Sequence, residues 1–193
     1  MITKDREYRS FDFETAEEMR ATGIPVVFNT PTLIAVIDGK ECYEVIDARA
    51  FDECDMSDVV LVENHAGKAA AKTRNQTLGL TVRSSDIYMD ADLSKNAVGR
   101  ELHEDIRNGF YEKMSFAFHV LKDKFDKATR TRTILQIDKL YDVSAVDRPA
   151  YNQTSIMARS FFDAEAEKER MELREREQKL KKLALILNLS KGD

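Results

Sequence analysis

The chain has 193 residues, of which 42% are hydrophobic and 34% are charged, and its formal net charge is −5. This length suffices for one sizeable domain plus an appendage, and the acidic balance without a long basic run argues against nucleic acid as the main partner. The apolar clusters are too short to cross a bilayer, and residues 1–10 lack the apolar segment of a signal peptide. Cys42 and Cys54 are the only thiols, and we interpret both as structural or exposed. So few cysteines fit a reducing compartment, and we expect a cytoplasmic protein.

Along the chain, apolar runs separated by turn signals predict a series of short strands. A short helix is expected at 15–19, a hairpin turn at 38–39, and an exit from the sheet at 63–67, followed by a polar loop over 68–76. A longer helix should begin near residue 94 or 96 and end at Gly109. The expected strands are 24–29, 33–37, 41–46, 59–62, 77–83, 87–92, 111–120, 133–137 and 140–146.

The short gaps between these strands favour hairpins, and hairpins favour antiparallel pairing. We therefore expect a mainly β protein with flanking helices (α+β), built on an antiparallel β-barrel of about seven strands with the internal helix on its outside.

Residues 161–193 differ in character from residues 1–160, which we take as the β-barrel domain. Residues 163–189 contain no Gly or Pro, and Leu173, Leu180 and Leu187 recur every seven residues, although Arg176 interrupts the apolar seam. Acidic residues dominate the first half of this segment and basic residues the second, as suits the helix dipole. The segment is predicted to be a charged helical tail that either docks on the domain or contacts a partner.

One stretch, 111–120, carries a serine in a strand-like run. Ser115 shares a face with small or polar residues, whereas Met114 and Phe116 fall on the opposite, apolar face. Such a serine either fills a tight place in the core or presents a rigidly held hydroxyl. A nucleophilic serine needs a nearby base; His119 lies roughly 13 Å along the same strand, and His103 falls on a predicted helix with solvent around it.

His65 ends a buried strand and opens a loop, where a side chain can be both fixed and reachable. The three histidines are well separated and have no metal-ligand spacing, so a metal-dependent hydrolase is disfavoured. No metal or cofactor is expected.

Four stretches resemble the tailed-phage prohead (capsid maturation) protease family: 61–65 (LVENH), 73–80 (TRNQTLGL), 109–118 with MSFAF, and 141–150 (YDVSAVDRPA). Residues 26–29 and 46–51 are also similar to its opening strands, and the likeness runs in order over roughly residues 20–157. The resemblance implies a fold similar to that of herpesvirus assemblins and a serine endopeptidase. Family members act inside the immature capsid (prohead) in the host cytoplasm, remove the scaffolding part of the major capsid protein and often cleave themselves.

The resemblance places the family's histidine and serine on His65 and Ser115, which are 50 residues apart. The assemblin relatives have a second histidine as third member, but this chain has no histidine after His119. Asp142 in the matching strand is the preferred orienting acid, with Asp147 and Glu63 as alternatives.

Arg148 is a candidate for the oxyanion hole, either directly or by fixing a backbone amide. A homo-oligomer such as a dimer is plausible, and neither nucleic acid nor a membrane is an expected partner. The alternative is a catalytically inactive capsid-assembly or scaffold-binding module with the same fold.

Overall fold

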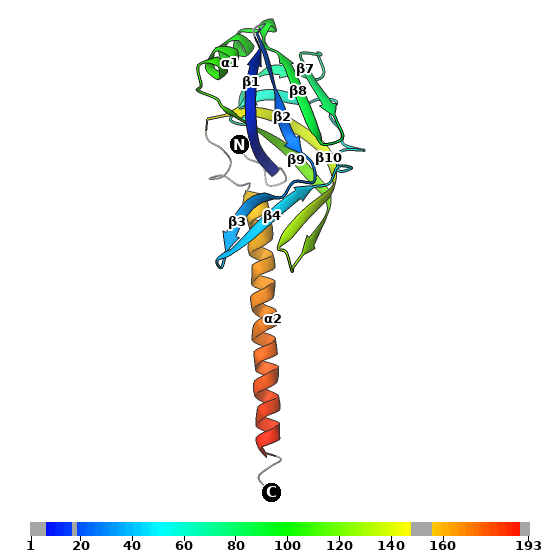
Figure 1. Ribbon diagram of the computed structural model, residues 1–193, viewed down its shortest axis with the longest axis vertical. Helices are drawn as coiled ribbons and strands as arrows, with labels where there is room; N and C mark the ends of the chain where they lie inside the picture. The colour runs from blue at the N-terminus through cyan, green and yellow to red at the C-terminus, as the bar shows by residue number, and fades with distance from the viewer. Residues whose placement is uncertain (1–6, 17–18, 148–155, 190–193) are drawn as a thin grey trace. The chain divides into compact units, whose positions relative to one another are not determined.

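The computed structural model describes residues 7–16, 19–147 and 156–189 (Figure 1). It divides into two compact units, residues 1–159 and 160–193. In the described residues, the first unit holds the strands, a short 3-10 helix (η1), the helix α1 and the first residues of the C-terminal helix. Its elements are β1 (Glu7–Ala16), β2 (Arg20–Val27), β3 (Thr32–Ile37), β4 (Lys40–Ile46), β5 (Val60–Glu63), β6 (Ala66–Lys72), β7 (Leu78–Val82), β8 (Asp86–Asp92), η1 (Leu93–Lys95), α1 (Ala97–Arg107), β9 (Lys113–Asp126) and β10 (Thr131–Val146).

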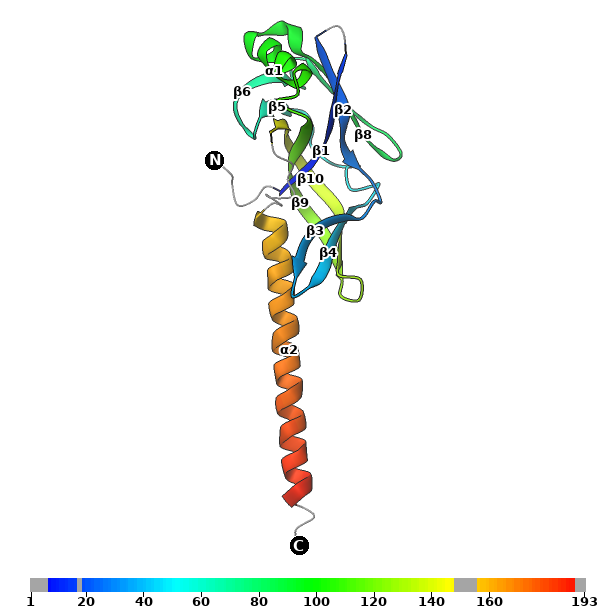
Figure 2. The ribbon, with the colours of Figure 1, turned by 60° about the vertical axis from the view of Figure 1, so that its left-hand side comes forward.

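The sheet is built around the long antiparallel ribbon of β9 and β10. One edge of the ribbon continues through β1, β2, β8 and β7, all antiparallel. On the other edge, β4 pairs in parallel with the start of β10 and β5 pairs in parallel with its end. Two hairpins, β3–β4 and β5–β6, are thereby attached to one strand at different points along its length (Figure 2).

The expected closed antiparallel barrel is wrong. Strand pairing among the described residues runs from β3 to β7 without joining these two ends, and the sheet is mixed because β4 and β5 run parallel to β10. The short gaps between the expected strands predicted hairpins, and hairpins such as β3–β4 and β5–β6 are present. How hairpins attach to each other depends on pairings between residues far apart in the sequence, such as Tyr43 with Thr131, which no local pattern reports.

Two further expectations about single segments were wrong. The short helix at 15–19 is replaced at its start by β1, and the polar loop at 68–76 is largely strand β6. The sequence of β6, AGKAAAK, has poor strand propensity, but pairing with β5 supplies its hydrogen bonds and overrides that preference. The chain therefore turns back at residues 64–65 instead of leaving the sheet.

The strand β9, which carries Ser115, lies at the centre of the core. Met114, Phe116 and Phe118 are fully buried on one face of β9, and the two phenylalanine rings stack with their centroids 4.9 Å apart. Ser115 and Ala117 on the other face are also buried. Because both faces of β9 are covered, the position of each of its side chains is fixed by packing on two sides.

The helix α1 begins and ends as its capping residues predict. The Asn96 side chain accepts a hydrogen bond from the backbone N–H of Gly99 at 2.7 Å and donates one to the Ala70 carbonyl at 2.9 Å. Gly109 follows the helix with a φ of +77°. The Asn96 contacts tie the start of α1 to β6, the strand that follows the His65 turn.

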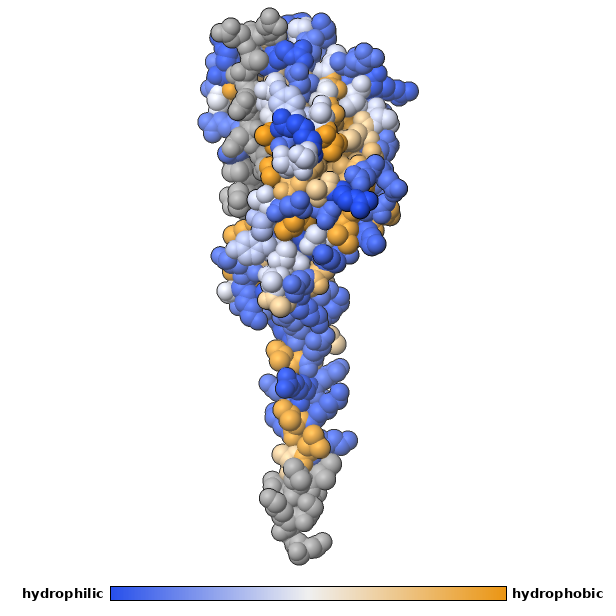
Figure 3. All heavy atoms as spheres, turned by 45° about the vertical axis from the view of Figure 1, so that its right-hand side comes forward, coloured by the Kyte–Doolittle hydropathy of each residue, from blue (hydrophilic) through white to orange (hydrophobic). Residues whose placement is uncertain are grey.

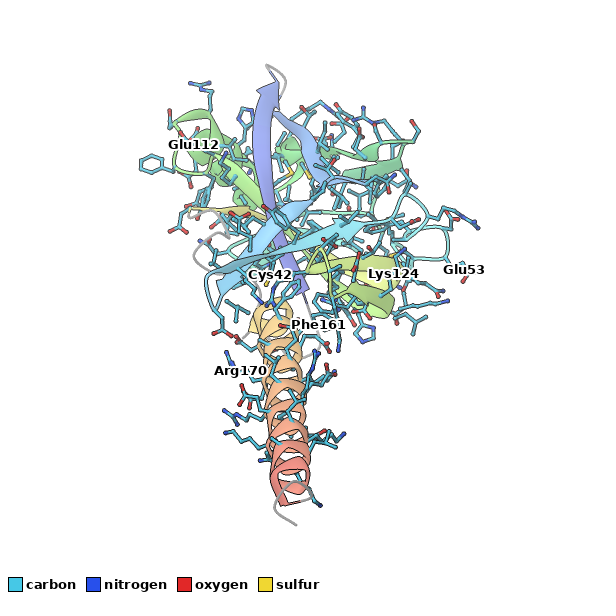
Figure 4. All side chains as sticks on the ribbon, turned by 60° about the horizontal axis from the view of Figure 1, so that its bottom comes forward. Cys42, Glu53, Glu112, Lys124, Phe161 and Arg170 are labelled. Carbon is cyan, nitrogen blue, oxygen red and sulfur yellow. The ribbon has the colours of Figure 1, made fainter. Side chains whose placement is uncertain are left out.

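The described part of the second unit is the helix α2 (Ile156–Leu189) from residue 160 onward. Residues 171–184 are exposed. Side chains such as Arg170 project outward from the helix (Figure 4), and Arg170 pairs with Glu167 at 2.8 Å. Leu173, Leu180 and Leu183 are more than half exposed, and apolar patches interrupt the charged surface of the helix (Figure 3). No helix in the described part of the chain is long and apolar enough to span a membrane.

Candidate functional site

His65 occupies a tight turn between β5 and β6. Glu63 pairs with Ala66, so only Asn64 and His65 form the loop, and both have positive φ values, +45° and +57°. A two-residue hairpin loop with two positive φ values matches the type I′ turn, which favours glycine at its second position. A histidine there accepts some backbone strain. The Asn64 N–H donates to the Ala145 carbonyl at 2.8 Å, which ties the turn to β10.

The acid beside this histidine is Asp142, on β10. Parallel pairing of β5 with β10 sets Asp142 beside Val60, which brings the end of β10 alongside the turn that follows β5. His65 Nδ1 lies 2.6 Å from Asp142 Oδ1. Their side chains are 15% and 7% exposed, so the bond is largely shielded from solvent.

Sequence reasoning missed Ser144, which completes this cluster. Its hydroxyl donates to Asp142 Oδ1 at 2.8 Å, accepts from the backbone N–H of His65 at 3.1 Å, and lies 3.0 Å from His65 Nδ1. Ser144 is fully buried. The available signal was its spacing, because residues two apart in a strand share a face, so Asp142 and Ser144 had to point the same way.

This geometry selects one form of the imidazole. A carboxylate oxygen only accepts hydrogen bonds, so a contact of 2.6 Å with Nδ1 requires the ring proton to sit on Nδ1. In the neutral ring Nε2 then carries the lone pair and can accept a proton. His65 is thus arranged as a base whose orientation is fixed by Asp142.

Ser115 lies on the neighbouring strand. It is the register partner of Ser144 in the β9–β10 ribbon, so their side chains emerge on the same face of the sheet. Ser115 is 2% exposed, and its Oγ is buried without a hydrogen-bond partner in the described part of the chain. Leaving a buried hydroxyl unpaired costs about 1–3 kcal/mol, and such a group in a folded protein calls for an explanation.

The alternative acids occupy other surroundings. Asp147 is exposed, and its backbone N–H lies 3.4 Å from Asn64 Oδ1. The Glu63 carboxylate lies 3.5 Å from the Tyr111 hydroxyl, and burial, followed by the charges of Asp105 and Glu101, raises its pKa. Arg148, the oxyanion-hole candidate, lies outside the described residues.

The remaining histidines lie elsewhere. His119 forms a separate pair with Asp138 at 2.7 Å, with both side chains more than one-third exposed. His103, expected in solvent, is instead buried on the inner face of α1.

Metal ligation and thiol chemistry find little support in the described part of the chain. No group of three or more His, Cys, Asp or Glu residues there is arranged to hold a metal ion. Cys42 is buried, and burial raises the pKa of the Cys54 thiol to about 12. Since the thiolate is the nucleophile, Cys54 is a poor candidate at neutral pH, and Cys42 is shielded from solvent by burial.

The comparison with family models identifies the family of this chain. The family model of the caudovirus prohead serine proteases matches residues 5–170, and the chain belongs to that family. Among solved structures, the bacteriophage T4 capsid assembly protease is similar with 13% sequence identity and a TM-score of 0.38, over 72% of this chain and 98% of that one. The search of curated proteins found no match.

Proposed function

We propose that this protein is a serine endopeptidase that processes the phage capsid protein, including its scaffolding region, and cleaves itself during prohead maturation. The observation that carries the proposal is the shielded 2.6 Å contact between His65 Nδ1 and Asp142 Oδ1, beside the strand that presents Ser115. Membership in the prohead protease family supports the same chemistry and the prohead as its location.

In the proposed mechanism, Ser115 Oγ attacks the carbonyl carbon of the scissile peptide bond while its proton passes to Nε2 of His65. Asp142 stabilises the imidazolium that forms. The proton then passes from Nε2 to the leaving amine, and the carbonyl carbon stays bonded to Ser115 Oγ. In the second half, Nε2 takes a proton from a water molecule that attacks this carbon, and the proton passes to Ser115 Oγ as its bond to the carbon breaks. The negative oxygen of the tetrahedral intermediate needs hydrogen-bond donors, each worth about 3 kcal/mol, and Arg148 remains the candidate for supplying or positioning one.

The burial of Ser115 adds a condition to this mechanism. A hydroxyl that is 2% exposed must become accessible before a peptide can reach it. Binding of the capsid substrate, or of a second copy of the chain, is the proposed event that opens the site. Catalytic hydrogen bonds often tighten only in the substrate complex, so the unpaired Oγ is consistent with a site awaiting substrate.

The same burial favours the second candidate, an inactive capsid-assembly module. In that case, Ser115 would be a core residue and α2 a contact for the scaffold. An inactive module has no chemical need for the His65–Asp142 arrangement, which is why we prefer the protease.

A mass spectrum of the purified protein after incubation, with and without its cognate capsid protein, tests the proposal. The wild type should shorten itself or cleave the capsid protein, and Ser115→Ala should do neither while retaining its circular dichroism spectrum. Equal behaviour of both proteins in the presence of the capsid protein would favour the inactive module.

A further inference from the structure

Ser144 contacts each part of the His65–Asp142 pair and has no place in the mechanism above. Its hydroxyl has one proton to donate, and the carboxylate of Asp142 at 2.8 Å is the strongest acceptor within reach. Its oxygen can then accept two hydrogen bonds. The backbone N–H of His65 supplies one at 3.1 Å, and the ring Nδ1–H, 3.0 Å away, is shared between this oxygen and Asp142.

We infer that Ser144 is a positioning residue that locks the orienting acid and the base of this site into one geometry, an inference that rests on the proposed function of His65 and Asp142. Asp142 Oδ1 receives donors from both the ring and Ser144, so rotation of the carboxylate would break two hydrogen bonds instead of one.

The bond to the backbone of His65 acts on a different degree of freedom. His65 has a φ of +57°, a conformation that L-residues adopt at some energetic cost. Ser144 holds the N–H of this residue, and the neighbouring N–H of Asn64 is held by the Ala145 carbonyl at 2.8 Å. Two consecutive residues of β10 thus fix two consecutive residues of the turn, which sets the direction in which the ring leaves the backbone.

Ser144 is itself held firmly enough to act in this way. It is fully buried and lies inside β10, with Val62 as its register partner on β5 and Ser115 on β9. A side chain fixed by strands on both sides loses little further freedom when it forms hydrogen bonds. The hydroxyl of Ser144 is engaged by Asp142 and the His65 N–H, whereas Ser115 Oγ has no hydrogen-bond partner among the described residues, which separates the roles of the two serines.

The test compares side chains of equal shape with and without the hydroxyl. Ser144→Thr and Ser144→Val add the same methyl branch, but only threonine keeps the O–H, so their difference isolates the hydrogen bonds from any packing strain. Ser144→Ala removes the hydroxyl without adding volume. Ser94→Ala serves as the matched control, because Ser94 also donates to an aspartate, Asp92, at 2.6 Å, but at η1.

The first readout is independent of catalysis. With ¹⁵N-labelled histidine, the Nδ1–H proton of His65 should give a low-field resonance that is absent in a His65→Gln variant. We expect this resonance to persist in Ser144→Thr and Ser94→Ala, and to broaden or disappear in Ser144→Val and Ser144→Ala as the ring becomes mobile. An unchanged resonance in the valine and alanine variants would overturn the inference.

The second readout is kinetic, with the cognate capsid protein as substrate. We expect kcat to fall by about 10- to 100-fold in the valine and alanine variants, a loss similar to that caused by removing groups that orient metal-bound histidines, with KM within about twofold of wild type. Threonine should restore most of kcat relative to valine. Equal rates for threonine and valine would refute the positioning role in catalysis. If wild-type protein were inactive while the resonance still depended on the hydroxyl, the proposed protease function would fail and the positioning of His65 by Ser144 would stand.

Discussion

Replacing Asp142 by asparagine should abolish nearly all catalysis while preserving the fold. Oδ1 of Asp142 accepts hydrogen bonds from both His65 Nδ1 and Ser144 Oγ. An asparagine amide has nearly the same shape but no charge, and its NH₂ group can turn toward the ring and donate to Nδ1. The ring proton then moves to Nε2, where it prevents transfer from Ser115. In a serine protease with the same arrangement, this change lowers kcat about 10⁴-fold, which corresponds to about 5 kcal/mol of transition-state stabilisation.

The assay is the rate of capsid-protein cleavage by purified enzyme, with thermal unfolding as the check on folding. Asp147→Asn and Glu63→Gln are the matched variants, because they neutralise the two alternative acids at the same edge of the sheet. We expect both to keep wild-type cleavage rates within a few-fold. If Asp142→Asn retained more than about one-tenth of the activity while either of the other variants lost it, the assignment of Asp142 would be wrong.

Three further predictions concern the framework around the site. Phe116→Ala should lower the free energy of unfolding by about 3–5 kcal/mol, because the ring is fully buried. A loss below about 1 kcal/mol in urea denaturation, as expected for a substitution on the surface, would contradict the described core. Gly99→Ala should lower the free energy of unfolding by about 1–3 kcal/mol, although alanine favours helices. The reason is that the added Cβ would lie 2.5 Å from the Leu93 carbonyl oxygen. An unchanged melting temperature would show that this contact relaxes freely. Glu63→Gln should be more stable than wild type at pH 8 and equal to it at pH 3. Burial and Asp105 raise the pKa of Glu63 in the folded state, so ionisation of Glu63 lowers the stability of the wild type as pH rises through that pKa. A stability difference that is the same at both pH values would refute this cause.

Local sequence signals predicted much of the secondary structure. The hairpin at residues 38–39 was expected from its Asp-Gly pair, and both residues have positive φ values in the structure. The α1 cap at Asn96 and the end at Gly109 were also confirmed. These features depend on neighbours in the chain, which is why a sequence pattern suffices to find them.

The resemblance to prohead proteases was confirmed by the family match, whereas the detailed arrangement of the site came only from the structure. The resemblance favoured Asp142 over Asp147 and Glu63, but the contact of Asp142 with His65 came from the structure. No sequence pattern pointed to Ser144. The turn at Asn64–His65 was taken as an exit from the sheet, because its tightness depends on pairing between β5 and β6.

The sequence by itself determined that this chain is mainly β, that a serine lies in a buried strand, and that a charged helical segment follows the strands. Period-2 patterns, caps and charge distribution carry these conclusions because each reflects interactions within about ten residues. The tertiary structure alone decided that the sheet is mixed and not a closed barrel, and that His65, Asp142 and Ser144 meet. The sheet is mixed because β4 and β5 pair in parallel with β10, and it stays open because β3 and β7 do not pair among the described residues. The meeting of His65, Asp142 and Ser144 depends on the pairing of β5 with β10, which joins residues about 80 positions apart. Such a pairing is selected by the packing of the whole sheet, and no short stretch of the chain contains the information that specifies it.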